Sequence, residues 1–381
     1  MLLQRTITPQ ILDSLQPNKV VVLFGPRRVG KTVLIQQILK NTKHSFLLLN
    51  GEDVATQELL QRRSIQNYRN ILGETQLLVI DEAQAIPDIG SILKLIVDNI
   101  DNIKILVTGS SAFDIENTVG EPLTGRKKTY RLFALSEEEF GQIEQVTQKK
   151  DNLHQRLVFG NYPELIHLAS MEDRSDYLKE VVNSYLLKDI LAFETVNNSG
   201  KIKNLLRLIA FQIGNEVSLQ ELGNQLSLSK NTVEKYLDLL TKVFVLHKVE
   251  GFSRNLRKEV SKSSRWYFYD NGLRNALIAN LSPLALRDDI GKLWENYIIS
   301  ERLKYQKYHK IIVNNYFWRT YDQQEIDWVE EREGALYGYE FKWKTNKKVK
   351  APVAWRKSYE NASFEVVDPS NYLDWVIKNR D

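Results

Sequence analysis

The fold is decided by the stretch Val20-Val-Val-Leu-Phe-Gly-Pro-Arg-Arg-Val-Gly-Lys-Thr32. Five apolar residues of strand length run directly into a loop with two glycines, and Val33–Leu39 then has helical spacing. A continuous apolar strand is typical of a buried parallel sheet. Strand, glycine loop and helix together form the context in which this loop pattern binds phosphate. We therefore expect an α/β fold whose parallel sheet is sandwiched by helices.

Each part of the loop has an expected role in binding ATP. Gly25 and Gly30 would let the backbone wrap around the β-phosphate, and the helix N-terminus adds partial positive charge. Lys31 would pair with the β- and γ-phosphates, and the Thr32 hydroxyl would ligate Mg²⁺. A chance match is a weak alternative, because the flanking strand and helix are both present. The predicted nucleotide-binding loop comprises Gly25, Pro26, Arg27, Arg28, Val29, Gly30, Lys31 and Thr32.

Two further apolar strands end in polar residues. Gln76–Ile80 leads to Asp81 and Glu82, about 50 residues after the loop. Asp81 would hold Mg²⁺ through a water, and Glu82 would polarise the attacking water as general base. A simple cap of the following helix is the weaker alternative. Lys104–Thr108 leads to Gly109-Ser110-Ser111, where a polar side chain would lie beside the γ-phosphate.

Four segments carry a family resemblance: LVIDEAQ (78–84), LVTGSSA (106–112), LTGR (123–126) and GNYPEL (160–165). With the loop, they resemble the AAA-type P-loop ATPases of bacteria and archaea that carry a nuclease-like C-terminal domain. The resemblance implies a strand inserted between the loop strand and the Asp81 strand. It makes Ser110 or Ser111 a sensor, Arg126 an arginine finger or sensor in cis or in trans, and Pro163 part of a lid motif beside the adenine. A structural ion pair for Arg126 and a helix-entry proline at Pro163 are the alternatives.

The middle of the chain is predicted to be helical. Ser136 and Glu139 have the spacing of a capping box, which opens the expected lid. Three further helices are predicted at Ile202–Ile213, Leu219–Leu226 and Lys230–Leu240, the last two capped by serines. This rhythm favours a winged helix whose third helix presents Lys230, Asn231 and Lys235 to the major groove of DNA. Its wing strands are expected at Val243–His247 and Trp266–Tyr269. An ATPase lid or a dimer contact would use the same helices.

The C-terminal part contains a helix at Gly291–Leu303, three strands at Ile311–Phe317, Glu325–Val329 and Ala335–Trp343, and a closing helix near Asn371–Lys378. If Glu333 and Gly334 form the turn, Trp328 faces Tyr339 and Asp327 faces Glu340. Lys342 then points to the same face. Two carboxylates this close repel unless a cation lies between them, and such a pair suits Mg²⁺ or Mn²⁺.

Asp327 followed by Glu340-x-Lys342, with Glu295 on a preceding helix, resembles the PD-(D/E)xK nucleases. The resemblance implies that Glu295, Asp327 and Glu340 hold the metal and that Lys342 orients or deprotonates a water. Ile326 replaces the proline that usually precedes the first acid. In the alternative, Lys342 only neutralises Asp327 and Glu340. The expected domains are 1–135 (ATPase core), 136–198 (helical lid), 199–284 (winged helix) and 285–381 (α/β nuclease-like domain).

Composition excludes several classes of protein and of binding site. The 381 residues are 43% hydrophobic and 26% charged, which predicts a folded globular protein. With no cysteine, disulfides and thiolate metal sites are excluded. No apolar run is long enough to span a bilayer and no signal peptide is recognisable, so a cytoplasmic protein without a membrane partner is expected. A net charge of +4 is too small to argue for nucleic acid, but Phe341–Lys357 contains seven basic residues and no acid.

Together these patterns predict an ATP-hydrolysing protein that acts on DNA, with a Mg²⁺-dependent nuclease-like domain and a possible homo-oligomer. The alternative is an ATP-switched regulator that binds DNA or protein and does not cut.

Overall fold

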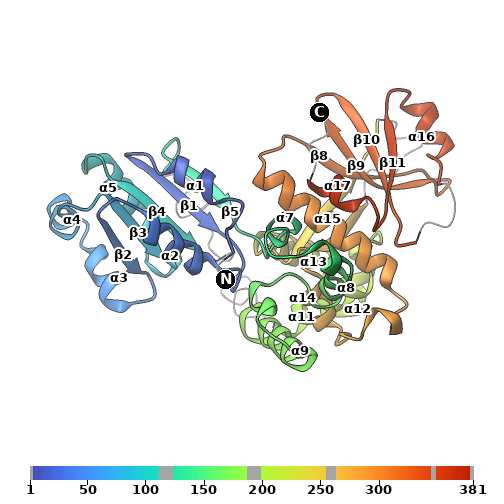
Figure 1. The fold of residues 1–381 in the computed structure, drawn as a ribbon, viewed down its shortest axis with the longest axis horizontal. Helices are drawn as coiled ribbons and strands as arrows, with labels where there is room; N and C mark the ends of the chain where they lie inside the picture. Colours follow the sequence, from blue (N-terminus) through green and yellow to red (C-terminus); the bar gives the residue numbers. More distant parts are fainter. Residues whose placement is uncertain (1–2, 111–122, 187–198, 255–262, 345–348, 378–381) are drawn as a thin grey trace. The chain divides into compact units, whose positions relative to one another are not determined.

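The structure is a computed structural model that describes residues 3–110, 123–186, 199–254, 263–344 and 349–377. The chain forms two compact units, Met1–Ala134 and Leu135–Asp381 (Figure 1). We call them the N-terminal and C-terminal units. Within the described ranges, no helix combines the length and apolar character needed to cross a bilayer.

The N-terminal unit is built on a parallel sheet in the order β2-β3-β4-β1-β5. Its strand β4 lies between β1 and β3, so the inserted strand implied by the family resemblance is confirmed. The strands are β1 (Lys19–Phe24), β2 (Phe46–Asn50), β3 (Leu77–Asp81), β4 (Lys104–Gly109) and β5 (Lys127–Arg131).

Helices cover both faces of this sheet. The helices are α1 (Thr8–Ser14), α2 (Lys31–Asn41), α3 (Val54–Gln61), α4 (Ile65–Leu72), the 3-10 turn η1 (Ala83–Ala85) and α5 (Ile89–Asn99). The connections through α2 and α5 cross the sheet in opposite directions, and right-handed crossovers then place these two helices on opposite faces (Figure 1). The central apolar runs of β1, β3 and β4 are accordingly fully buried.

The C-terminal unit begins with helices whose starts follow the predicted caps. The Ser136–Glu139 capping box is present, and Ser218 and Ser229 accept from the backbone N–H groups of Glu221 and Thr232. The helical elements before the second sheet are α7 (Glu137–Phe140), η2 (Val146–Gln148), α8 (Lys149–Phe159), η3 (Pro163–Ile166), α9 (Met171–Glu180), η4 (Val181–Leu186), α11 (Ser199–Phe211), α12 (Leu219–Leu226) and α13 (Lys230–Lys242).

A mixed sheet in the order β11-β10-β9-β8-β6-β7 forms the rest of the C-terminal unit. Its strands are β6 (Leu246–Gly251), β7 (Ser264–Phe268), β8 (Asn314–Arg319), β9 (Glu325–Arg332), β10 (Ala335–Phe341) and β11 (Ser363–Val367). The accompanying helices are α14 (Asn271–Leu277), η5 (Leu284–Leu286), α15 (Ile290–Tyr308), α16 (Val353–Ser358) and α17 (Tyr372–Ile377).

The register of the β9–β10 hairpin agrees with the sequence. Glu333 and Gly334 both have positive φ, 49° and 80°, and Trp328 pairs with Tyr339 as predicted. The backbone ladder ends at that pair. Beyond it, the Asp327 carboxylate accepts a hydrogen bond from the backbone N–H of Phe341 at 2.9 Å.

The strand pair expected to form the wing is present as part of a larger sheet. Strands β6 and β7 are antiparallel neighbours, but β6 also pairs in parallel with β8 through Glu250–Tyr316 and Gly251–Phe317. The pair therefore extends the C-terminal sheet, and a boundary at residues 284 and 285 does not separate two sheets.

Candidate functional site

The phosphate-binding loop follows β1 and ends where α2 begins. Gly25 is required by close approach, since a Cβ atom there would lie 2.2 Å from the carbonyl oxygen of Leu132. Gly30 has a φ of 93°, which favours glycine. The Lys31 ammonium group donates to the carbonyl oxygens of Gly25 and Pro26 at 2.9 and 3.1 Å. The loop thus holds a nearly buried cation against its own backbone.

The loop hydroxyl and the acidic pair meet at the ends of β1 and β3. The Thr32 hydroxyl donates to Asp81 Oδ2 at 2.7 Å. Glu82 follows with a left-handed φ of 51°, and its carboxylate accepts from the Gln84 amide. Hydroxyl and carboxylate oxygens are ligands that Mg²⁺ prefers, so Thr32 and Asp81 fit the ion that accompanies ATP.

A second cluster of charged residues lies in the C-terminal unit. The structure brings together Glu295 of α15, Asp327 of β9 and Glu340 of β10. Burial, followed by the negative charges of Glu295 and Glu340, raises the pKa of Asp327 well above its usual value. Glu340 accepts from the Lys342 ammonium group at 2.6 Å, and Glu295 accepts from the Tyr267 hydroxyl at 2.7 Å.

A guanidinium group lies among these acids. Nη1 of Arg265 is 3.9 Å from both Glu295 and Asp327, and its Nη2 donates to Glu325 at 2.9 Å. In the part of the chain that the structure describes, no group of three or more Asp, Glu or His side chains is arranged to hold a metal ion. The expected metal set of Glu295, Asp327 and Glu340 therefore does not fit Mg²⁺ in this arrangement, because cationic side chains already contact all three acids.

Comparison with known proteins gives a family match for most of the N-terminal unit. Residues 17–141 match the family model described as "AAA domain". An AAA domain therefore lies within residues 17–141, which supports the predicted AAA-type P-loop ATPase. Residues 150–284 and 290–372 match two models described only as domains of unknown function, DUF8612 and DUF4143.

Relatives along most of the chain are uncharacterised proteins. One from Mycobacterium tuberculosis is 26% identical over 342 residues, which is 89% of this chain and 74% of that protein. One from Methanocaldococcus jannaschii is 24% identical over 387 residues, which is 94% of this chain and 82% of that protein. A solved structure of a RuvB variant from Thermotoga maritima is similar at 16% identity and a TM-score of 0.33, covering 64% of this chain and 89% of that one.

Two residues of the N-terminal unit that the sequence did not single out support the first site. Arg5 donates to the carbonyl oxygen of Val29 at 2.7 Å and to that of Phe133 at 2.6 Å. Thr108 of β4 donates to Asp81 and accepts from the backbone N–H of Glu82 at 3.2 Å. The supporting role of Thr108 could have been predicted from its position as a polar residue at the end of an apolar run. No sequence pattern around Arg5 indicated its role.

The remaining predicted nucleotide contacts have varied surroundings. Ser110 is buried directly after β4, whereas Ser111 lies outside the described residues. Arg126 is partly exposed and pairs with Asp98 at 2.7 Å, as the structural alternative expected. Arg28 has a left-handed φ of 66° within the loop.

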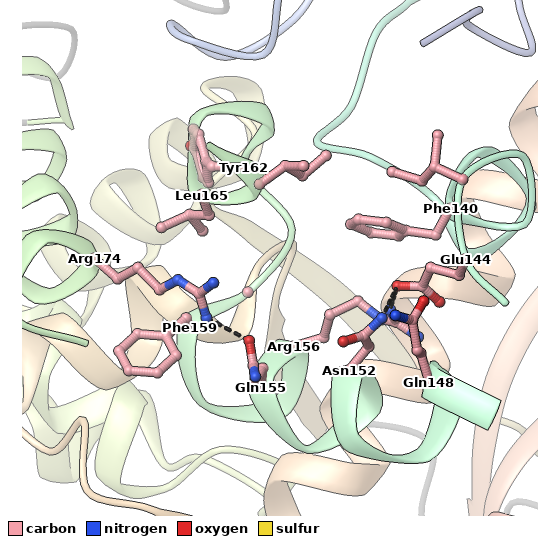
Figure 2. A pocket seen from close by; sticks show the side chains of 13 residues that line it. Phe140, Glu144, Gln148, Asn152, Gln155, Arg156, Phe159, Tyr162, Leu165 and Arg174 are labelled. Atoms are coloured by element: carbon pink, nitrogen blue, oxygen red, sulfur yellow. Dashed lines mark hydrogen bonds and ion pairs between the residues drawn. The ribbon is translucent and has the colours of Figure 1, made fainter. Parts of the chain in front are cut away.

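The GNYPEL segment borders a cavity of about 250 Å³ inside the C-terminal unit. Figure 2 shows Arg174 beside Phe159 and Gln155, and Glu144 with Asn152 near Arg156. Of the lining residues, Arg156 forms ion pairs with Glu144, which also lines the cavity, and with Glu137. Pro163 opens η3, as expected of a helix-entry proline, and its contact with adenine stays a prediction.

The expected DNA-facing residues lie on the first half of α13. Lys230, Asn231 and Lys235 are all exposed. In the basic stretch, by contrast, Phe341 and Trp355 are buried, and Lys347 and Lys348 lie outside the described residues. Two of its three aromatic residues are therefore packed inside and do not offer a stacking surface for bases.

Proposed function

We propose that the chain binds and hydrolyses ATP at the loop Gly25–Thr32 and uses it to act on DNA. The observation that carries hydrolysis is the contact of Thr32 with Asp81, with Glu82 held beside it. Mg²⁺ bound with ATP would be held by Thr32 and Asp81, and it would neutralise charge on the phosphate oxygens.

Glu82 is proposed as the general base. Its carboxylate follows the strand that carries Asp81, and the Thr108 hydroxyl fixes its backbone N–H at 3.2 Å. The Gln84 amide donates to the carboxylate and orients it. A carboxylate held in this way can accept a proton from a water that attacks the γ-phosphate.

Glu82→Gln tests this assignment. The variant should bind ATP with unchanged affinity but hydrolyse it about 100-fold or more slowly, because only the proton acceptor is lost. Phosphate release and binding of a fluorescent ATP analogue measure the two properties. Glu74→Gln, an exposed change in the same domain, is the matched control. Wild-type turnover in Glu82→Gln would remove Glu82 from this role.

Action on DNA is supported by the capped helix α13, which exposes Lys230, Asn231 and Lys235 together. Such residues at the start of a helix can contact phosphates and base edges in a major groove. Ser110 and Arg126 are proposed as contacts of the γ-phosphate and Pro163 as a contact of the adenine. Arg126 would have to leave Asp98, and a role in trans would require a second copy of the chain.

For the C-terminal unit, the geometry favours binding without cutting. Arg265 and Lys342 contact the acids that a nuclease would use for its metal. The function best supported is therefore an ATP-driven or ATP-switched protein that holds DNA through this unit.

A further inference from the structure

We infer that Arg265 is the built-in cation of the acidic cluster formed by Glu295, Glu325, Asp327 and Glu340, and that this cluster takes up no divalent cation while Arg265 is present. The inference does not depend on ATP hydrolysis, because every residue involved lies in the C-terminal unit.

The position of Arg265 is fixed on several sides. Its side chain is only 6% exposed, and its guanidinium group lies over the ring of Phe317 at 4.5 Å. Nη2 donates to Glu325, while Nη1 is equally distant, at 3.9 Å, from Glu295 and Asp327. Strand β7 places the arginine in the same sheet as the acids of β9 and β10.

The distances from Nη1 to Glu295 and Asp327 fit charge compensation better than hydrogen bonding. At 3.9 Å, Nη1 is too far to donate to either carboxylate. The buried Nε atom has no hydrogen-bond partner among the described residues. The guanidinium group is therefore held in the cluster by one hydrogen bond to Glu325, by attraction to the surrounding negative charges and by packing against Phe317.

The same position works against a metal ion. Mg²⁺ binds carboxylate oxygens at about 2.0–2.1 Å, so an ion shared by Glu295 and Asp327 would lie within a few ångströms of Nη1. Two cations this close repel strongly in a buried site. The Lys342 ammonium group at 2.6 Å from Glu340 adds a second positive charge. The negative charge of these acids is compensated by the cationic side chains of Arg265 and Lys342 in the same chain.

Removing the arginine should therefore create a metal site. The experiment titrates Mn²⁺ into the nucleotide-free full-length protein by calorimetry. Wild-type protein should show no binding that depends on Asp327. Arg265→Gln should bind one Mn²⁺ per chain, about 100-fold or more tightly than wild type, because a unit charge a few ångströms away has been removed. Arg265→Gln combined with Asp327→Asn should lose that binding.

The matched control is Arg254→Gln, which removes an arginine that follows β6 and pairs with Glu331 of β9 at 3.2 Å. This variant should behave as wild type. A folded Arg265→Gln protein without Mn²⁺ binding would overturn the inference. If Arg265→Gln does not fold, wild type and Asp327→Asn decide alone: equal Mn²⁺ titrations support the inference, and one Mn²⁺ bound by wild type but lost in Asp327→Asn refutes it.

Discussion

Arg5 connects two parts of the AAA domain although it lies outside the nucleotide loop. Its guanidinium group donates to Val29 within the loop and to Phe133 beyond β5. Buried backbone carbonyl oxygens that lose a charged donor are costly, because water cannot replace the lost partner. A single side chain near the N-terminus therefore helps to fix the conformation of the loop.

We expect Arg5→Met to lower the free energy of unfolding of the AAA domain by about 3 kcal/mol, from the loss of two charge-assisted hydrogen bonds. ATP affinity should fall as well, since Val29 is no longer anchored. Urea denaturation and binding of a fluorescent ATP analogue measure the two effects. Arg69→Met, an exposed arginine of α4, should change neither. A variant as stable as wild type would show that these two bonds contribute little.

At the scale of elements, Asp270 links the start of α14 to the GNYPEL segment. Its carboxylate caps α14 through Leu273 and accepts from the backbone N–H of Asn161 at 2.7 Å. Gly160 must be a glycine, because its φ is 77° and an added Cβ would lie 2.1 Å from the Asp270 carboxylate. This segment therefore stabilises the C-terminal unit through its contacts with Asp270, whatever it contributes to nucleotide binding.

Gly160→Ala should destabilise the C-terminal unit by about 3 kcal/mol or more, since steric overlap adds to the cost of the positive φ. Gly334→Ala is the matched control. Gly334 has a similar φ of 80°, but apart from the glycine and its two chain neighbours no described residue has an atom within 4 Å of the point that a Cβ would occupy. That change should cost about 1 kcal/mol. Chemical denaturation compares the two variants, and equal losses would rule out the contact with Asp270 as the cause.

Helix α13 is the element predicted to contact DNA. Lys230→Ala and Lys235→Ala together should weaken duplex binding and reduce the log–log salt slope by about 1.8, because each lost phosphate contact contributes about 0.9. Fluorescence anisotropy at several salt concentrations measures the slope. Lys242→Ala, at the far end of α13 and paired with Asp238, should leave it unchanged. An unchanged slope in the double variant would move the DNA contact away from α13.

Features that depend on neighbouring residues could be predicted from the sequence. The serine caps of α12 and α13 and the hairpin turn at Glu333 follow from short-range chemistry. Strand β11 was not predicted, because it is short and only partly buried. The pairing of β6 with β8 and the contact of Arg265 with Asp327 join residues more than 60 positions apart. Local patterns do not specify which distant segment a strand or an arginine will meet.

On the scale of the whole molecule, the chain places its two groups of charged residues in separate compact units. The Thr32–Asp81 contact lies in the N-terminal unit, and the Arg265 cluster lies in the C-terminal unit. Each unit has its own sheet and its own buried apolar residues. A ligand of one site should therefore stabilise chiefly the unit that contains it, since binding stabilises only the structure that must be folded to bind.

Calorimetry of the full chain should consequently show two unfolding transitions. A non-hydrolysable ATP analogue with Mg²⁺, at about 100 times its Kd, should raise one transition by roughly 5–10 °C, because the stabilisation is about 2.7 kcal/mol for a domain of this size. Gly160→Ala should lower the other transition and leave the ligand-induced shift intact. A single transition that moves as a whole with both the ligand and the substitution would show instead that the two units unfold as one cooperative structure.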